Sequence, residues 1–284
     1  NEGSLNMLRR ASSEKPLDQA FHKRLVDALK VYLLIGGMPE VVRAYCATRD
    51  LRACREILSD LLTTFKEDFA KYKAKAPALL LNETLQSICV QSGGKFKYSS
   101  VDRSLGSKPV KDALELLLLS GLVIKVQHSD ARGKPLGAQV NSKRFKVILL
   151  DVGLHQCILG LDISEMITAR GLDVVNKGAL AEVFVGQELV AAQSNREPAS
   201  LHYWHREARS SNAEVDYVTI YNKHVMPIEV KAGGRGSMQS IRLFMKERGL
   251  IKGLRVSLEN FAQLDNLDIV PLYAVAQYLR SDVE

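Results

Sequence analysis

Apolar residues recur at helical spacing through the first part of the chain. They fall every three or four positions, which is typical of amphipathic helices. Gly36-Gly37 ends the first helix, and Pro39 suits the first position of the second. The three predicted helices cover residues 16–34, 39–47 and 51–72. The polar residues 1–15 are expected to be frayed, and the helices are expected to pack as a bundle.

The pattern changes after Pro77. Helices are predicted first, with Ser107 as a good N-cap for the last of them. Two apolar strands separated by a Gly- and Pro-containing loop follow. The predicted helices cover residues 78–91, 99–105 and 108–119, and the strands 122–126 and 144–150. Three helices followed by a two-stranded wing describe a winged helix, in which the third helix contacts DNA. The cations around it are Lys95, Lys97, Arg103, Lys108 and Lys111. Protein–protein contact is the alternative use of this motif.

The remainder of the chain predicts an α/β sandwich around a mixed sheet. Residues 151–176 look irregular to helical, and an almost wholly apolar helix follows at 178–193. The later elements are strand 201–205, a hairpin, helix 238–248, and strands 254–258 and 269–274. The fold class is therefore α+β multidomain. The expected domains are 1–77 (helical region), 78–150 (winged helix) and 151–284 (α/β sandwich).

The hairpin carries the most distinctive chemistry. A two-residue turn at Asn222-Lys223 would place Asp216 opposite Glu229 and Glu214 opposite Lys231. Strict alternation would bring all four side chains to one face, with opposite Cβ atoms about 4.5–5.5 Å apart. Two carboxylates and a lysine so placed can hold a divalent cation and stabilise developing negative charge. The alternative is a solvated charged face with an ordinary cross-strand ion pair.

Two acids on the apolar helix 178–193 also stand out. Glu182 and Glu188 each share a stripe with apolar residues. Each acid lies either at the edge of its stripe or at a functional position, and periodicity does not separate the two.

Composition narrows the function classes. The chain has 284 residues, of which 46% are hydrophobic and 25% charged, as in soluble globular proteins. No apolar run approaches the roughly 20 residues that span a bilayer. The net charge of +7 and pI of about 9.2 are compatible with a polyanionic partner. Four scattered cysteines without a C-x-x-C pair favour free thiols in a reducing cytoplasm and disfavour a zinc site.

The D…E-x-K hairpin, preceded by an acid-bearing helix and a strand and followed by a helix, resembles the core of the PD-(D/E)XK nuclease superfamily. Several phrases also resemble a family of prokaryotic ATP-binding proteins. In that family an AAA ATPase domain precedes a nuclease-like domain of unassigned function. The phrases are Leu34–Glu40, Asp68–Tyr72, Leu149–Leu154, Gly178–Glu182, Tyr203-Trp204, Glu214–Val218, Pro227–Lys231 and Pro271–Ala274. They span nearly the whole chain.

The family's P-loop has no counterpart in this sequence. The resemblance therefore implies that this chain corresponds to the region after the ATPase domain, as its start at Asn1 also suggests. ATP binding is expected of the longer protein only. The first forty or so residues are expected to be the tail of the ATPase lid.

The nuclease resemblance implies specific roles. Asp216, Glu229 and the carbonyl of Val230 would bind Mg²⁺ or Mn²⁺. Lys231 would orient the attacking water, and Glu182 would complete the acidic site from its helix. Ser237 and Gln239 could touch phosphate, although helix capping better suits Ser237.

Three functions are compatible with these features. The first is a metal-dependent DNA phosphodiesterase attached to the ATPase, in the cytoplasm and without membrane contact. The alternative is a catalytically silent module that binds DNA or protein and regulates the ATPase. A tail that only dimerises the ATPase is the third, so self-association stays open.

Overall fold

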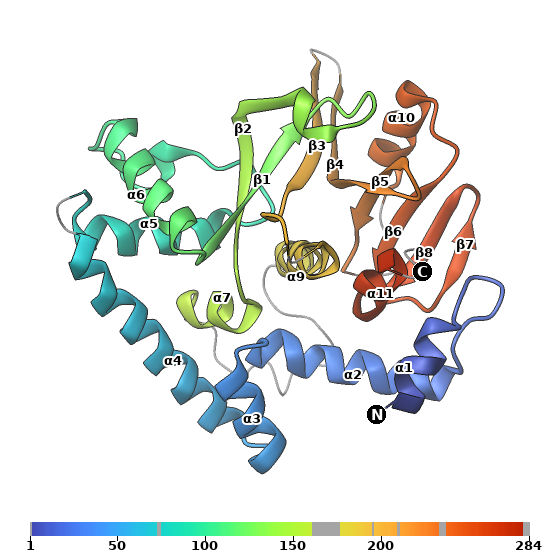
Figure 1. Ribbon diagram of the computed structural model, residues 1–284, viewed down its shortest axis with the longest axis horizontal. Coiled ribbons are helices and arrows are strands. Elements are labelled where there is room, and N and C mark those ends of the chain that lie inside the picture. Colours follow the sequence, from blue (N-terminus) through green and yellow to red (C-terminus); the bar gives the residue numbers. More distant parts are fainter. Residues whose placement is uncertain are drawn as a thin grey trace. The chain divides into compact units, whose positions relative to one another are not determined.

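A computed structural model describes residues 2–72, 75–160, 177–194, 196–208, 211–232 and 237–280 (Figure 1). Its α-helices are α1 (Glu2–Arg9), α2 (Gln19–Ile35), α3 (Pro39–Thr48), α4 (Leu51–Asp68), α5 (Ala78–Gln91), α6 (Ser107–Leu119), α7 (Val152–Ile158), α9 (Lys177–Ala192), α10 (Gln239–Arg248) and α11 (Val275–Arg280). Its strands are β1 (Val123–Ser129), β2 (Val140–Leu149), β3 (Leu201–Ala208), β4 (Ser211–Tyr221), β5 (His224–Val230), β6 (Gly253–Ser257), β7 (Ala262–Leu264) and β8 (Leu267–Pro271). None of the described helices is both long and apolar enough to cross a membrane.

The described strands form one mixed sheet, in the order β2-β1-β3-β4-β5-β6-β8-β7. β3, β4 and β5 are an antiparallel meander. β6 lies parallel to β5, and β8 lies parallel to β6. β7 is an antiparallel edge strand beside β8. The protein therefore has a mixed α+β fold with a mixed sheet, as the sequence predicts.

The chain divides into two compact units. Unit 1 comprises residues 1–29, 126–145 and 185–284, and unit 2 comprises residues 30–125 and 146–184. The predicted domain boundaries at 77/78 and 150/151 both lie inside unit 2, and they stay a prediction. The borders of the two units themselves fall within α2, β1, β2 and α9.

Most helix predictions are confirmed to within a few residues, because each helix has a regular apolar stripe. The third helix ends earlier than predicted, at Asp68, and Phe69–Tyr72 continues as a 3-10 turn. The prediction that residues 1–15 are frayed is wrong for Glu2–Arg9, which is helical. Leu8 of this helix is half-buried, and α1 lies against α11 within unit 1.

The predicted wing is part of the large sheet. The strands that follow α6 are present as β1 and β2, but β1 also pairs in parallel with β3, through Val126–Leu201 to His128–Tyr203. The predicted helix over 99–105 is only a 3-10 turn at Tyr98–Ser100. The N-cap of α6 is Gly106, one residue before the predicted one. The strands therefore extend a common sheet.

In unit 2, a buried carboxylate joins two of the family-like phrases. Asp151 caps α7 by accepting the Leu154 N–H at 2.9 Å, and it accepts the Gly37 N–H at 2.7 Å. Gly36 has φ +71°, and a Cβ there would lie 2.2 Å from Asp151 Oδ1. Only glycine fits this left-handed position against the carboxylate. The turn between α2 and α3 is thus fixed to the start of α7.

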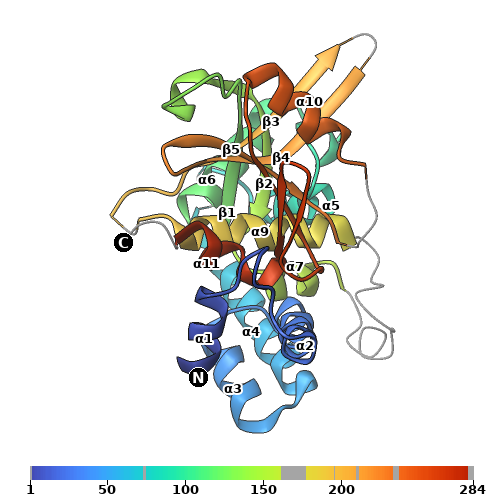
Figure 2. The same cartoon turned by 90° about the vertical axis from the view of Figure 1, so that its right-hand side faces the viewer.

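In unit 1, α10 packs on the hairpin strands β4 and β5 (Figure 2). The buried cluster between them includes Trp204, Val215, Val218, Ile241 and Phe244. The rings of Trp204 and Phe244 pack with 5.0 Å between their centroids and planes tilted by 58°. This cluster holds one face of the hairpin against a helix.

The N-terminal segment of unit 1 is attached to the last strands of the chain. Leu17 exchanges two backbone hydrogen bonds with the side chain of Asn260, at 3.3 and 2.7 Å. His22 Nδ1 lies 2.7 Å from the hydroxyl of Tyr273. Tyr273 belongs to the family-like phrase Pro271–Ala274, which is thereby an attachment point for α2.

A neutral histidine is buried between α5 and α7 in unit 2. His155 is 1% exposed, and its Nε2 donates to the carbonyl oxygen of Cys89 at 3.2 Å. Its Nδ1 has no hydrogen-bond partner in the described part of the chain. Burial lowers the pKa of His155 from 6.5 to about 4. The charged form is therefore disfavoured in the folded state.

This burial predicts acid sensitivity. Between pH 6.5 and about 4 the unfolded chain binds a proton at His155 that the folded chain does not, so stability falls as the pH falls. The loss attributable to this residue is about 3 kcal/mol across the window. Urea denaturation from pH 7.5 to 4.5 measures it, and His155→Gln should reduce the slope. His224→Gln, a change at an exposed histidine, is the matched control and should leave the slope unchanged. Equal slopes for the wild type and His155→Gln would contradict the prediction.

Candidate functional site

A two-residue turn sets the register of the hairpin. Asn222 and Lys223 have φ of 46° and 64°, the left-handed values that a type I′ turn requires at both central positions. The strands pair from Tyr221–His224 to Tyr217–Ile228. This is the predicted register, and it leads directly to the acidic residues beyond the last pair.

β4 contains a bulge at Asp216, the first of the predicted metal ligands. On either side of it, β3 and β4 pair as His202–Val218 and Trp204–Val215. Two residues of β4, Asp216–Tyr217, therefore lie opposite a single residue of β3. Such a bulge reverses the alternation of side chains along the strand. Accordingly, Val215 and Val218 belong to the same buried cluster under α10.

The bulge separates Glu214 from the other acids. Val218 pairs with Pro227, and Glu229 lies two residues further along β5 on the same face. Glu214 stands between two residues of the cluster and so points to the opposite face, where its carboxylate is 4.0 Å from His205 Nε2. The prediction that all four charged side chains share one face is thus wrong for Glu214.

Asp216, Glu229 and Lys231 are brought together in unit 1. Asp216 Oδ2 accepts the backbone N–H of Val230 at 2.8 Å across the hairpin. Lys231 Nζ donates to Glu229 Oε1 at 2.6 Å. Glu229 is 5% exposed, whereas the side chain of Lys231 is 27% exposed. The lysine thus reaches from a buried carboxylate toward solvent.

A further cation lies on the neighbouring strand. Arg255 of β6 is the register partner of Glu229 and is 5% exposed. Partners on adjacent parallel strands share a face. The guanidinium of Arg255 contacts Glu259 Oε2 at 3.0 Å. The sequence pattern did not single out Arg255, because its place beside Glu229 depends on a pairing between strands that a helix separates.

Glu182 lies in unit 2, where it forms a buried ion pair. Its Oε1 is 2.7 Å from Nζ of Lys146 on β2, and the two side chains are 8% and 1% exposed. Within its own unit, Glu182 is therefore bound to a lysine that sequence inspection missed. Lys146 lies among apolar residues of a strand, and a lone cation in such a run was the available signal.

The donor set of unit 1 suits a hard divalent cation. Asp216, Glu229 and the Val230 carbonyl all offer oxygen ligands. Mg²⁺ commonly binds through one or two protein carboxylates and completes its shell with water and phosphate oxygens. In the described ranges there is no cluster of three or more His, Cys, Asp or Glu side chains arranged for a metal. The residues fit a cation that is bound through two protein carboxylates and completes its shell with water and phosphate oxygens.

Ser237 and Gln239 lie at the start of α10. The hydroxyl of Ser237 accepts the Gln239 N–H at 3.3 Å, but the N-cap of α10 is Met238, so the N-cap predicted at Ser237 is wrong by one residue. Glu188, the second acid of α9, is partly buried, and burial raises its pKa while Arg280 opposes that shift. All four cysteines are free, as predicted.

The predicted nucleic-acid residues lie in unit 2. Lys97, Arg103, Lys108 and Lys111 are exposed, and Lys95 is half-buried. Lys111 forms an ion pair with Glu115 at 3.7 Å on the surface of α6. The set is accessible, and its contact with DNA stays a prediction.

Comparison with known proteins finds two domains. Residues 26–165 match the family described as "Domain of unknown function (DUF8612)". Residues 177–275 match the family described as "Domain of unknown function (DUF4143)", which is commonly associated with AAA-type ATPases. No curated protein and no solved structure matches this chain. The second match includes Asp216, Glu229 and Lys231, and both matches lack an assigned activity.

The buried pair in unit 2 predicts a marked asymmetry between single and double variants. Lys146→Met leaves the Glu182 carboxylate buried without its cation and should cost about 3–5 kcal/mol in the free energy of unfolding. Lys146→Met combined with Glu182→Leu should recover most of that loss. Chemical denaturation measures both. Lys111→Met, which breaks an exposed pair, is the control and should change stability little. A double variant as unstable as the single would disprove the interpretation.

Proposed function

We propose that this chain is a metal-dependent DNA phosphodiesterase module of a larger AAA-type ATP-binding protein in the cytoplasm. One observation carries the proposal. A type I′ turn and a bulge hold Asp216 and Glu229 on adjacent strands, with Lys231 at 2.6 Å from Glu229. Carboxylates and a lysine in a half-buried cluster are the groups that metal-assisted phosphate hydrolysis needs.

Each residue has a role that its contacts support. Asp216 is oriented by the Val230 N–H, which fixes one carboxylate oxygen across the hairpin. Glu229, which is almost fully buried, supplies a second carboxylate in a region of low dielectric. The Val230 carbonyl adds a third oxygen. A divalent cation bound to these oxygens would supply Lewis-acid activation of the phosphate and lower the pKa of a bound water.

Lys231 carries the positive charge closest to solvent. It lies where it can contact a phosphate oxygen or orient a water while it remains paired with Glu229. Arg255, on the next strand, contributes a second positive charge beside Glu229. These charges would stabilise the extra negative charge of the transition state, the general role of preorganised cations in phosphoryl chemistry.

The fold is compatible with the finer assignment that the sequence suggests. The meander β3–β5 followed by parallel β6 supports a PD-(D/E)XK sandwich, and α5, α6, β1 and β2 support a winged helix extended into the sheet. The association of the second matched domain with AAA-type ATPases supports attachment to such a motor.

A silent module is the second candidate. The observation that favours it is the balance of charge, because Lys231 already neutralises Glu229 and Arg255 stands beside it. A site balanced in this way can bind DNA or protein and regulate the ATPase without hydrolysis.

Cleavage assays separate the two candidates. The wild-type chain should nick plasmid and linear DNA with Mg²⁺ or Mn²⁺, whereas Asp216→Asn and Lys231→Met should each lose at least about 100-fold in rate. Calorimetric titration with Mn²⁺ should show binding by the wild type and loss of it in Asp216→Asn. Gel separation of nicked and linear products measures the rate.

The control variant is Glu214→Gln. It removes an acid from the same strand, but one that points to the other face beside His205. Its cleavage rate should stay within a few-fold of wild type. Cleavage that persists in Asp216→Asn, or its absence from both the wild-type chain and the full-length protein, would refute the enzymatic proposal.

A further inference from the structure

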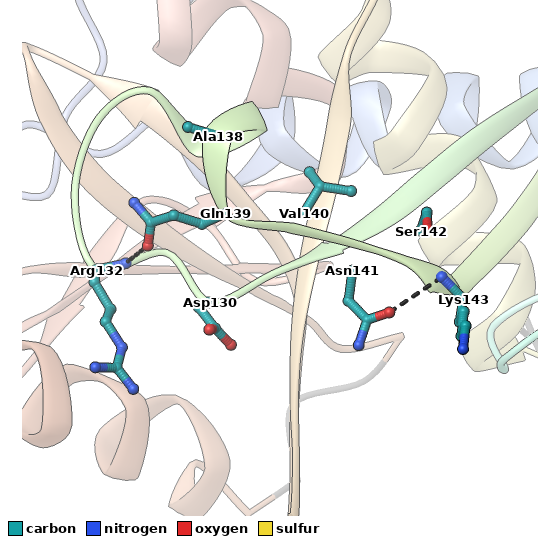
Figure 3. A pocket seen from close by; sticks show the side chains of 8 residues that line it. All are labelled: Asp130, Arg132, Ala138, Gln139, Val140, Asn141, Ser142 and Lys143. Carbon is teal, nitrogen blue, oxygen red and sulfur yellow. Dashed lines mark hydrogen bonds between the residues drawn. The ribbon is translucent and has the colours of Figure 1, made fainter.

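A groove lies in unit 1 at the loop between β1 and β2 and at the first residues of β2 (Figure 3). Its volume is about 1000 Å³. The residues that line it are Asp130, Arg132, Ala138, Gln139, Val140, Asn141, Ser142 and Lys143. In Figure 3, Arg132 and Lys143 lie at opposite ends of this row, with Asp130 and Asn141 between them. Polar side chains and the apolar Ala138 and Val140 therefore line the groove together, with a cation at each end.

The loop is held in one conformation by hydrogen bonds to its own backbone. Gln139 closes it on both sides, because its Oε1 accepts the Arg132 N–H at 2.8 Å and its Nε2 donates to the Gly133 carbonyl at 3.2 Å. The Asp130 N–H donates to the Gln139 carbonyl at 3.1 Å. A loop fixed in this way presents its side chains with little ordering entropy left to lose on binding.

The same loop is anchored in the core of unit 1. Ala131 and Leu136 are 1% and 6% exposed and belong to the cluster under α10. Arg248 of α10 donates its Nε–H to the Asp130 carbonyl at 3.0 Å, and its guanidinium lies 5.8 Å from the centre of the Trp204 ring. The cationic side chains thus project from a rigid base.

Three cations here are exposed and have no ion pair in the part of the chain that the structure describes. They are Arg132 and Lys134 of the loop and Lys143 of β2. Arg43, Lys71 and Arg242 differ, since each lies within 4.0 Å of a carboxylate. Among the described residues that line the groove, Asp130 alone carries a carboxylate. An excess of positive charge is therefore available to a ligand.

We propose that this groove binds the phosphate backbone of double-stranded DNA, as a contact surface separate from the hairpin site. The inference rests on the proposed function in so far as DNA is the substrate. The cations match the charge of phosphates, and Gln139, Asn141 and Ser142 offer amide and hydroxyl groups of the kind that contact phosphate and sugar. Contacts to phosphate and sugar carry no sequence information directly, so the proposed contact is independent of base sequence.

Strand addition by an acidic peptide suits the groove less well. β2 is the outer strand of the described sheet, and an open edge can accept a further strand. However, Asn141 Oδ1 accepts the Lys143 N–H at 3.1 Å, which occupies a donor of the exposed end of β2. A side chain that satisfies the strand's own backbone competes with such pairing. The phosphate backbone needs only the side chains.

Binding without cleavage tests the proposal. The complete chain carrying Asp216→Asn is titrated, in EDTA, into two fluorescein-labelled 20-base-pair duplexes of unrelated sequence, and anisotropy gives the dissociation constants. Arg132→Gln, Lys134→Gln and Lys143→Gln together should weaken binding at least about tenfold for both duplexes. They should also flatten the salt dependence by about 0.9 log units per log unit of salt for each phosphate that the variant no longer neutralises.

The matched control removes three paired cations, in Arg43→Gln, Lys71→Gln and Arg242→Gln. It changes the net charge equally and should change affinity less than about threefold. Equal losses in the two triple variants, or an unchanged affinity in the first, would overturn the proposal. So would a labelled poly-glutamate peptide that binds more tightly than DNA and loses affinity in the first triple variant.

The two proposals fail in different ways. If the phosphodiesterase proposal alone fails, no DNA is cut with Mg²⁺ or Mn²⁺ while the triple variant still loses affinity. If the groove proposal alone fails, the wild-type chain cuts DNA while the triple variant binds as tightly as its parent.

Discussion

One extra residue in β4 decides which side chains of the hairpin can act together. The bulge at Asp216–Tyr217 reverses the alternation of the strand, so that the apolar residues on both sides of it pack under α10. Without that reversal, half of the strand would turn its apolar side chains away from the helix, which a sheet buried on this face does not tolerate. The same bulge brings the Asp216 carboxylate to the Val230 N–H and sends Glu214 to the other side. The geometry of the candidate site is thus a consequence of core packing.

Lysine and arginine side chains have two contrasting environments in this protein. At the hairpin, the partly exposed Lys231 is bound to the buried Glu229 at 2.6 Å, and in unit 2 the buried Lys146 is bound to Glu182 at 2.7 Å. Such pairs must recover the cost of removing both charges from water, so they persist only with good geometry. At the β1–β2 loop, the cations stay exposed on a rigid base and are bound to no described carboxylate. The modest net charge of +7 therefore understates how unevenly the free positive charge is distributed.

The elements that the sequence predicted well are those whose cause is local. The long amphipathic helices follow from spacing along one segment, and the hairpin turn follows from two adjacent residues, Asn222 and Lys223, that adopt positive φ. The features that the sequence did not predict depend on partners far away in the chain. The bulge can be predicted only if the pairing of β4 with β3 is known. β1 and β3 pair although β2, α7 and α9 lie between them in the sequence, and Lys146 binds Glu182 across 36 positions. The short helices α1 and α11 lie against each other although they come from opposite ends of the chain.

The way unit 1 is assembled has a consequence for the order of folding during synthesis. Residues from the start, the middle and the end of the chain meet in it, and Leu17 binds Asn260 across 243 positions. Unit 2, by contrast, draws only on residues up to 184. As the ribosome delivers the chain from its N-terminus, unit 2 is complete first, while the segment before it must wait for the final strands. Until then Leu17 and His22 lack their partners and stay accessible to chaperones and proteases. The synthesis of residues 260–273, which contain the partners of Leu17 and His22, is thus the step that closes unit 1.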